Sequence, residues 1–376
     1  MEELKTLEES QKYFGDFLKE NKIQKLLWVC GNSWKNQKLC QILEETAKEQ
    51  NVSIFYFSDF KPNPTYDSVL AGLGCYRENG CDAIAAAGGG SALDVAKCIK
   101  LFSTMDEEME ARKEGSYLKQ KSAENHVPFL TIPTTAGTGS EATRYAIIYY
   151  KGEKQSVTED LLLPSHVILC PDVLEGLSDY QRKATMLDVL CHAVESYWAV
   201  SADETSQNYA AEAMKLLVEN KDGYLENTRE GNEGMLEAAN LAGKAINISR
   251  TTVPHAMCYK ITSLFGASHG HAAALCLPVV WEYMLDHMEQ VSSPKGRAYV
   301  QKNFQELARC LGCEEPRKGV QWMKDLLKKL KMEVPAIKEE QMELLVSSVN
   351  PARLKNNPVA FDREDLKKLY ENVGNL

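Results

Sequence analysis

The chain has 376 residues, of which 44% are hydrophobic and 26% are charged, and its formal net charge is −10. This length exceeds what a single hydrophobic core usually organises, so we expect two domains. The negative charge argues against nucleic acid and anionic membrane surfaces as partners, and no apolar run is long enough for a membrane span.

Cysteine usage and the first residues bear on the cellular compartment. The eleven cysteines are an odd number, and a chain of this size does not need disulfides for stability. Residues 1–20 contain no continuous apolar stretch of the kind found in secretory leaders. We therefore expect a cytoplasmic protein whose thiols are reduced.

The first half of the chain alternates short apolar runs with segments of helical periodicity. Strands are predicted at 26–30, 52–57, 82–87 and 129–132, and helices at 35–49, 66–79 and 91–103. This alternation is typical of βαβ units, which build a parallel sheet covered by helices. Residues 1–176 are therefore predicted to form an α/β domain.

The second half has a different pattern, because long segments with helical periodicity dominate it. Helices are predicted at 180–200, 206–219, 233–248 and 320–330, and no convincing strand pattern is present. The pattern predicts an all-helical domain over residues 177–376, with the domain boundary near 171–178.

Two glycine-containing loops follow predicted strands in the first half. The triple glycine Gly88–Gly90 with Ser91 stands before a predicted helix, whose free N–H groups and positive dipole end suit a phosphate. Residues 133–141 form a second loop, which is rich in hydroxyl groups and glycine. Either loop alone could be a simple turn, but two of them at strand ends favour a dinucleotide.

Acidic and histidine side chains in the second half suggest a metal site. Asp188 and His192 are four residues apart in a predicted helix, so both lie on one helix face. Taken alone, such a pair is usually an exposed hydrogen bond. With His255 and His269, however, it makes one carboxylate and three imidazoles, which suit Fe(II) or alternatively Zn(II) with a position left for substrate. The ion would polarise a carbonyl group.

With these motifs the chain resembles the iron-containing, or group III, alcohol dehydrogenases over nearly its whole length. The matching positions are Gly88, Gly89, Gly90, Ser91, Asp94, Ala96, Lys97, residues 133–141, Asp188, His192, His255, His269 and Gly270, while residues 62–65 resemble the family's PNP loop. The resemblance implies a Rossmann-like N-terminal domain, a helical C-terminal domain and a homo-oligomer, which we expect to be a dimer. It also implies that a metal is held by Asp188, His192, His255 and His269.

The resemblance implies a cofactor site as well, with the pyrophosphate on the triple-glycine loop. The residues predicted to bind the cofactor are Gly31, Asn32, Ser33, Gly88, Gly89, Gly90, Ser91, Asp94, Thr134, Thr135, Thr138 and Lys154. The loop after the first strand lacks the carboxylate that often binds the ribose 2′-hydroxyl, and Lys35 lies close by. NADPH is therefore predicted to be preferred over NADH.

Two departures from the family pattern concern the catalytic residues. Tyr259 stands where the family usually has a histidine near the nicotinamide, and His271 follows His269-Gly270 where the family's HGxxN ending lacks it. Tyr259 and His271 are therefore predicted to be catalytic. The alternative interpretation makes Tyr259 a core residue whose hydroxyl is satisfied.

Substrate residues are predicted from a narrower resemblance. Arg144, Lys260 and the string 256–270 look similar to a subgroup that reduces phosphonoacetaldehyde to 2-hydroxyethylphosphonate. Arg144 and Lys260 are thus predicted to bind a phosphonate, although either could instead be an ordinary surface cation. Two other functions stay open: reduction of uncharged aldehydes such as butanal, and a metal-dependent lyase or cyclase of the dehydroquinate-synthase type.

Overall fold

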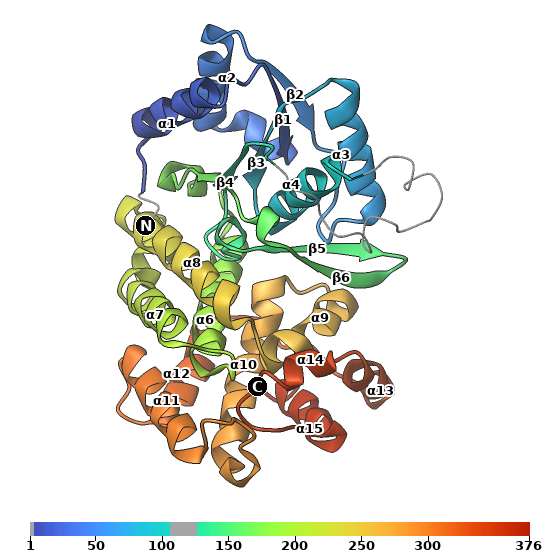
Figure 1. Ribbon diagram of the computed structural model, residues 1–376. Helices are drawn as coiled ribbons and strands as arrows, with labels where there is room; N and C mark the ends of the chain where they lie inside the picture. The colour runs from blue at the N-terminus through green and yellow to red at the C-terminus, as the bar shows by residue number, and fades with distance from the viewer. Residues whose placement is uncertain (1–3, 106–125) are drawn as a thin grey trace. The chain divides into compact units, whose positions relative to one another are not determined.

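The computed structural model describes residues 4–105 and 126–376, and it separates into an N-terminal unit, Met1–Gly176, and a C-terminal unit, Leu177–Leu376 (Figure 1). The first unit is an α/β domain and the second is helical, which confirms the predicted fold class. Among the described residues, no helix is both long and apolar enough to cross a membrane.

The N-terminal unit is built on a sheet of five parallel strands. These are β1 (Lys25–Cys30), β2 (Ser53–Phe57), β3 (Ala83–Gly88), β4 (Phe129–Pro133) and β7 (His166–Val167), in the order β2-β1-β3-β4-β7. The order reverses between β1 and β3, and open parallel sheets bind ligands beyond the carboxyl ends of the strands at such a point. Cys30 pairs with Ala87, so the chain reaches Gly31 and Gly88 at the same edge of the sheet.

Helices cover both faces of this sheet. They are α1 (Leu7–Glu20), α2 (Lys38–Glu49), α3 (Tyr66–Glu78) and α4 (Gly90–Ser103), with a short 3₁₀ helix, η1 (Asn32–Asn36), before α2. Figure 1 shows α1 and α2 on one face and α3 and α4 on the other, in agreement with the contacts of α1 with α2 and of α3 with α4. Buried alanines along β3 let α4 pack closely on the strand.

A two-stranded hairpin, β5 (Tyr145–Tyr150) and β6 (Glu153–Thr158), was not expected from the sequence. Its two-residue turn has positive φ at both Lys151 and Gly152, which is the backbone conformation of a type I′ turn. The hairpin packs against α4. It leads to three short elements: η4 (Asp160–Leu162), β7 and η5 (Pro171–Leu174).

Lys97, on α4, donates hydrogen bonds to backbone atoms of both the hairpin and the loop region that precedes it. Its side chain is fully buried, and Nζ lies 2.6 Å from the Ser140 carbonyl oxygen and 2.8 Å from those of Thr143 and Tyr145. One turn earlier, Asp94 accepts hydrogen bonds from Ser140 Oγ and from a backbone N–H of β5. Burial lowers the pKa of Lys97 to about 8, although Asp94 counteracts this shift.

The C-terminal unit is an assembly of helices without a strand among its described residues. Its helices are α6 (Asp179–Trp198), α7 (Glu204–Leu225), α8 (Arg229–Ser249), α9 (Val253–Phe265), α10 (His269–Asp286), α11 (Arg297–Cys310), α12 (Pro316–Lys329), α13 (Glu339–Ser347), α14 (Pro351–Leu354) and α15 (Arg363–Val373). The central helix is α6, which contacts α7, α8 and α10 and begins with a capping box formed by Ser178 and Gln181.

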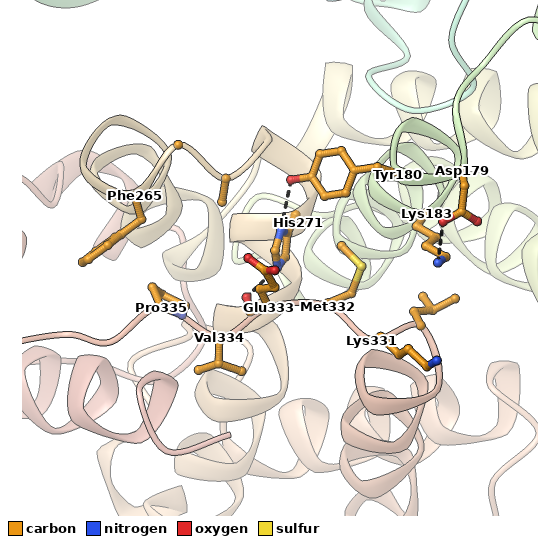
Figure 2. Close-up of a pocket in the computed structure, with 13 residues that line it drawn as sticks. Asp179, Tyr180, Lys183, Phe265, His271, Lys331, Met332, Glu333, Val334 and Pro335 are labelled. Atoms are coloured by element: carbon orange, nitrogen blue, oxygen red, sulfur yellow. Dashed lines mark hydrogen bonds and ion pairs between the residues drawn. The ribbon is translucent and has the colours of Figure 1, made fainter.

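A chain of hydrogen bonds fixes the start of α10 (Figure 2). The backbone N–H of Ser268 donates to the Tyr180 hydroxyl, which lies 3.1 Å from His271 Nδ1, and His271 Nε2 lies 2.9 Å from the Glu333 carbonyl oxygen. A carbonyl can only accept, so Nε2 carries the proton and Nδ1 accepts from the tyrosine. Tyr180, His271 and Glu333 line a pocket of about 490 Å³.

The buried lysine gives a testable statement about stability. We expect Lys97→Met to lower the free energy of unfolding of the N-terminal unit by about 3–5 kcal/mol, because Asp94 would stay buried without its cation. Urea denaturation followed by circular dichroism measures this change. Lys38→Met, at an exposed position of α2, is the control and is expected to have little effect. Equal stability of the two variants would contradict this role for Lys97.

Candidate metal centre and cofactor loops

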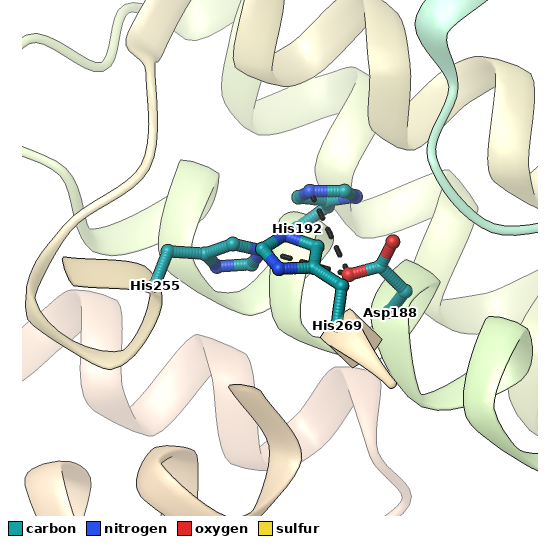
Figure 3. A group of neighbouring side chains, drawn as sticks. All are labelled: Asp188, His192, His255 and His269. Carbon is teal, nitrogen blue, oxygen red and sulfur yellow. Dashed lines mark ion pairs between the residues drawn. The ribbon is translucent and has the colours of Figure 1, made fainter. Parts of the chain in front are cut away.

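Four side chains in the C-terminal unit form a candidate metal centre (Figure 3). Asp188 and His192 come from α6, His255 from the first turn of α9, and His269 from the first residue of α10. One ligand atom from each lies within 4.8 Å of the others. Asp188 Oδ1 is 3.6 Å from His255 Nε2 and 3.9 Å from His192 Nε2.

The polar atoms of this group fit a divalent cation. Asp188 Oδ1 and His255 Nε2 are buried and have no hydrogen-bond partner among the described residues, which is uncommon for buried polar atoms. Burial opposes ionisation of Asp188, but the neighbouring histidines outweigh it and hold the pKa of its carboxyl below the ordinary value. A carboxylate with three imidazoles suits Fe(II) or Zn(II), whereas Mg²⁺ and Ca²⁺ prefer sites built from oxygen atoms.

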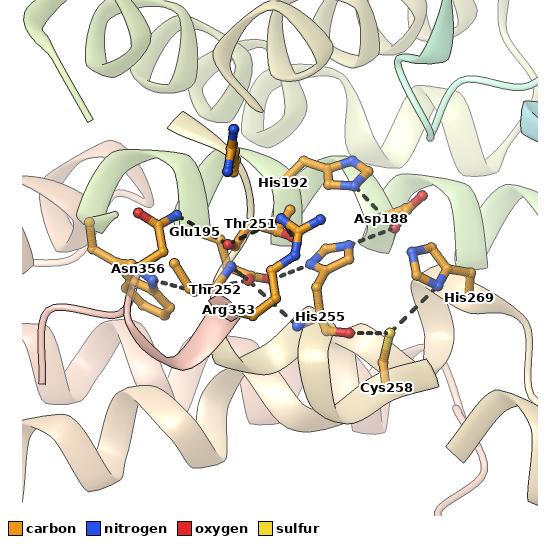
Figure 4. A network of polar contacts seen from close by, with 12 residues as sticks. Asp188, His192, Glu195, Thr251, Thr252, His255, Cys258, His269, Arg353 and Asn356 are labelled. Atoms are coloured by element: carbon orange, nitrogen blue, oxygen red, sulfur yellow. Dashed lines mark hydrogen bonds and ion pairs between the residues drawn. The ribbon is translucent and has the colours of Figure 1, made fainter. Parts of the chain in front are cut away.

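Glu195, which was not predicted from the sequence, holds His255 in place (Figure 4). Its carboxylate is fully buried and contacts Nδ1 of His255, and it accepts from the Thr252 N–H at 2.7 Å and the Thr252 hydroxyl at 2.9 Å. Thr252 is the N-cap of α9 but makes no side-chain capping bond itself. A carboxylate of α6 therefore both caps α9 and turns Nε2 of His255 toward the other ligands.

The charges around His255 couple metal binding to pH. Burial disfavours its protonated form, but Glu195 and Asp188 outweigh this effect and raise the pKa of His255 to about 9. A metal ion binds only the neutral imidazole at Nε2, so it competes with this proton. His269 is oriented differently, since its Nδ1 lies 3.5 Å from the Cys258 sulfur.

The spacing along α6 could have revealed Glu195. Asp188, His192 and Glu195 are related as i, i+4 and i+7, which places all three on one face of the helix. All three are buried in a helix that other helices surround, and a buried polar stripe of this kind needs partners. That pattern was available from the sequence alone.

Tyr259 and His271, the two residues predicted to be catalytic, have different surroundings. The Tyr259 ring stacks on that of His269, with centroids 5.5 Å apart and an interplanar angle of 9°. Burial raises the pKa of Tyr259 above its ordinary value, so the phenol keeps its proton at neutral pH. Both ring nitrogens of His271 are engaged by Tyr180 and Glu333, and His271 is not among the four residues of the metal group.

The structure brings the two predicted cofactor loops together. A Cβ atom at Gly89 would lie 3.3 Å from the Thr135 side chain, and one at Gly90 would lie 3.1 Å from Thr138. The N–H of Thr134 donates to the Gly88 carbonyl oxygen at 3.0 Å. Gly89 is the N-cap of α4 and makes no side-chain capping bond, so the first N–H groups of α4 are available to a phosphate.

The other predicted cofactor residues surround these loops. The Asp94 carboxylate is occupied by Ser140 and by β5, and Lys154 on β6 is near enough to act electrostatically on it. Gly31 directly follows β1, with no heavy atom within 4 Å of the position of an added Cβ. Asn32 and Ser33, in η1, are exposed.

The two predicted substrate cations lie in different units. Arg144 forms an ion pair with Asp160 at 2.8 Å, and both side chains are substantially exposed. Lys260 is half-buried on α9, next to Tyr259. The ordinary surface pairing considered for Arg144 is therefore the one seen, with Asp160 as the carboxylate.

The metal centre yields a prediction about Glu195. We expect Glu195→Gln to weaken metal binding by roughly 10- to 100-fold, because an amide orients His255 poorly and does not match the donors around it. Chelator competition on the folded protein measures this affinity. His255→Ala, which removes a ligand, is expected to lose the metal.

Asp365→Asn is the matched control, since Asp365 is a buried carboxylate that belongs to the capping box of α15 and not to the metal group. It should lower stability without changing metal affinity. Unchanged affinity in Glu195→Gln would contradict the role of Glu195, and full metal content in folded His255→Ala would contradict the ligand set.

Comparison with known families covers both units. Residues 6–171 match the family described as iron-containing alcohol dehydrogenase, and residues 183–374 match the C-terminal region of the Fe-containing alcohol dehydrogenase family. Aldehyde-alcohol dehydrogenase 2 of Entamoeba histolytica is 32% identical over 76% of this chain, but the chain spans only 34% of that longer protein.

Two further proteins match over most of both chains. Choline dehydrogenase of Bacillus subtilis is 31% identical over 79% of this chain and 73% of its own. The crystal structure of sulfoacetaldehyde reductase from Bifidobacterium kashiwanohense with NAD⁺ superposes with a TM-score of 0.85 and 26% identity, covering 97% of this chain and 94% of that one. From the family matches to both units and from these relatives, we conclude that the chain belongs to the iron-containing alcohol dehydrogenase family of oxidoreductases.

Proposed function

We propose that this protein is a metal-dependent oxidoreductase that uses NAD(P)H to reduce a short aldehyde to a primary alcohol. The observation that carries this proposal is the buried group of one carboxylate and three imidazoles, in a chain that also has glycine loops suited to a dinucleotide. Membership of the alcohol dehydrogenase family favours this reaction over the lyase or cyclase alternative. A homodimer and a cytoplasmic location stay predictions from the sequence.

In the proposed reaction, the four metal ligands and Tyr259 would have different roles. A divalent ion held by the four ligands would act as a Lewis acid toward the carbonyl, and the nicotinamide would supply the hydride. The carbonyl oxygen also needs a proton, and Tyr259 Oη holds one at neutral pH beside the ligand His269. The aldehyde, the reduced cofactor and this proton together give the alcohol and the oxidised cofactor.

For the substrate we propose phosphonoacetaldehyde, which would be reduced to 2-hydroxyethylphosphonate. The likeness to sulfoacetaldehyde reductase supports a two-carbon aldehyde with a tetrahedral anionic group. Choline, named for another relative, is a cationic alcohol. The charge at the far end of the substrate therefore differs among relatives, so the residue that recognises it must be found in this chain.

An aldehyde panel tests the proposed function. The protein loaded with Fe(II) or Zn(II) should oxidise NADPH when given phosphonoacetaldehyde, with butanal as the uncharged comparison. Removal of the metal by chelation should abolish turnover. A higher kcat/KM for butanal would retire the phosphonate substrate, and the absence of net NAD(P)H consumption with any aldehyde would contradict the proposed reaction.

Cofactor preference is tested at the end of β1. We propose that NADPH is preferred, because no carboxylate follows the strand and Lys35, over the ring of Tyr56, supplies a cation nearby. Gly31→Asp should shift the ratio of kcat/KM values toward NADH by about tenfold, since a carboxylate repels the 2′-phosphate and binds the ribose hydroxyl. The open space at Gly31 accommodates the new side chain.

The control for this change is Gly74→Asp, which adds the same charge at another open position of the N-terminal unit. It should leave the ratio unchanged. Equal efficiency of the unmodified enzyme with both cofactors would remove the argument for NADPH.

A further inference from the structure

Arg353, on α14, is a cation beside the metal centre that was not predicted from the sequence. The short helix α14 packs against α9, which carries His255 and Tyr259. The side chain of Arg353 is half-buried, and its Nη1 donates to the hydroxyl of Thr251 at 2.9 Å and to the Thr251 carbonyl oxygen at 3.4 Å (Figure 4).

The contacts of Arg353 join it to the network that orients the metal ligands. Thr251 directly precedes Thr252, whose N–H and hydroxyl bind Glu195, and Glu195 contacts His255. Asn356, one turn after Arg353, donates to the same Thr251 carbonyl oxygen at 3.2 Å. The guanidinium is therefore held by the loop that positions a metal ligand, so its location relative to the centre is fixed.

The guanidinium of Arg353 also has N–H donors that its contacts with Thr251 do not use. In the described part of the chain, Arg353 donates hydrogen bonds through Nη1 alone, both to Thr251, and no carboxylate forms an ion pair with it. The buried Arg182, by contrast, uses its guanidinium on Tyr224, Asn227 and Asn232. A half-buried guanidinium with unused donors is suited to an anion, because its planar fork matches the oxygens of a phosphonate or sulfonate.

The charge balance of the centre leaves Arg353 available for this purpose. Both carboxylates of the centre are engaged within it: Glu195 accepts from Thr252 and contacts His255, and Asp188 Oδ1 lies 3.6 Å from His255 Nε2. A divalent cation in the site balances these two charges. The guanidinium then adds a positive charge that no carboxylate of the centre neutralises.

Arg353 lies near Tyr259, the residue proposed above to supply the proton. Tyr259 lies on α9, the helix that α14 contacts, and Arg353 is near enough to interact with it electrostatically. The phenol ring in turn stacks on the ligand His269. Arg353, Tyr259 and the ligands thus form one neighbourhood within the C-terminal unit.

We propose that Arg353 binds the anionic end of the substrate and thereby selects phosphonate- or sulfonate-bearing aldehydes. This inference rests on the proposed aldehyde reduction and names the residue that determines its specificity. Arg144, the cation favoured by the sequence, already pairs with Asp160. The competing interpretation is that Arg353 only braces the loop around Thr251.

The test compares two substrates and one non-reacting anion in the metal-loaded enzyme. Arg353→Ala should lower the ratio of kcat/KM for phosphonoacetaldehyde to that for butanal by about 10- to 150-fold, the effect of losing a charged hydrogen bond. Methylphosphonate should inhibit butanal reduction by the unmodified enzyme, and this inhibition should weaken by a similar factor in Arg353→Ala. Arg353→Lys should restore part of both effects, since it keeps the charge but not the fork.

Arg309→Ala removes an exposed cation of the same unit and should change neither readout. Equal losses on both aldehydes, or lowered metal content in Arg353→Ala, would show a bracing role and overturn the proposal. A drop in the ratio for Arg144→Ala alone would transfer the anchor to Arg144.

The two hypotheses fail in distinguishable ways. If the enzyme does not reduce phosphonoacetaldehyde but methylphosphonate still inhibits through Arg353, the named substrate is wrong and the anion site stands. If phosphonoacetaldehyde is reduced equally well by Arg353→Ala, the function stands and the anchor is wrong. Absence of methylphosphonate inhibition in the unmodified enzyme overturns the anion site.

Discussion

The carboxylate of Glu195 is the interaction on which the metal centre depends. A fully buried carboxylate is tolerated only when donors surround it, and here Thr252 and His255 supply them. Those donors belong to the first residues of α9, whereas Glu195 belongs to α6. The helix contact and the orientation of a metal ligand are therefore one interaction, and the helical unit cannot pack these helices correctly without also arranging its site.

In the N-terminal unit a buried cation, Lys97, positions a loop in a similar way. Lys97 reaches from α4 into the carbonyl oxygens of a loop, just as Glu195 reaches from α6 to the N–H groups at a helix start. In both units a buried ionised side chain on a regular helix positions an irregular segment that carries binding groups. Such segments have few apolar contacts of their own, and a charged group with several partners holds them more rigidly than packing would.

The sequence predicted most of the elements near the cofactor loops but fewer of those around the metal. Strands β1 to β4 are apolar runs between turn residues, and such local patterns are readable. The β5–β6 hairpin was missed because β6 is polar and its pairing depends on contact with α4. No bounds were predicted for α9 and α10 within the expected helical domain, and Pro278 interrupts the sequence pattern of α10. The four ligands come together as the resemblance implied. The spacing along α6 marks Glu195 as a polar residue on the ligand face, but its partner His255 lies 60 positions away, and Thr251, the partner of Arg353, lies 102 positions away, so no local pattern reveals these contacts.

The hydrogen bonds of His271 have a consequence for how many ligands the ion takes. His269 and His271 are two residues apart in α10, so their side chains project from opposite sides of the helix and only His269 faces the other ligands. His271 is restrained by Tyr180 on one nitrogen and by the Glu333 carbonyl oxygen on the other, and releasing it would cost about 1–3 kcal/mol in lost hydrogen bonds. A fifth protein ligand would compete with a substrate oxygen for a metal ion held by the other four residues. Because the His271 imidazole is held by Tyr180 and Glu333, the four ligands would leave room for a small molecule to bind.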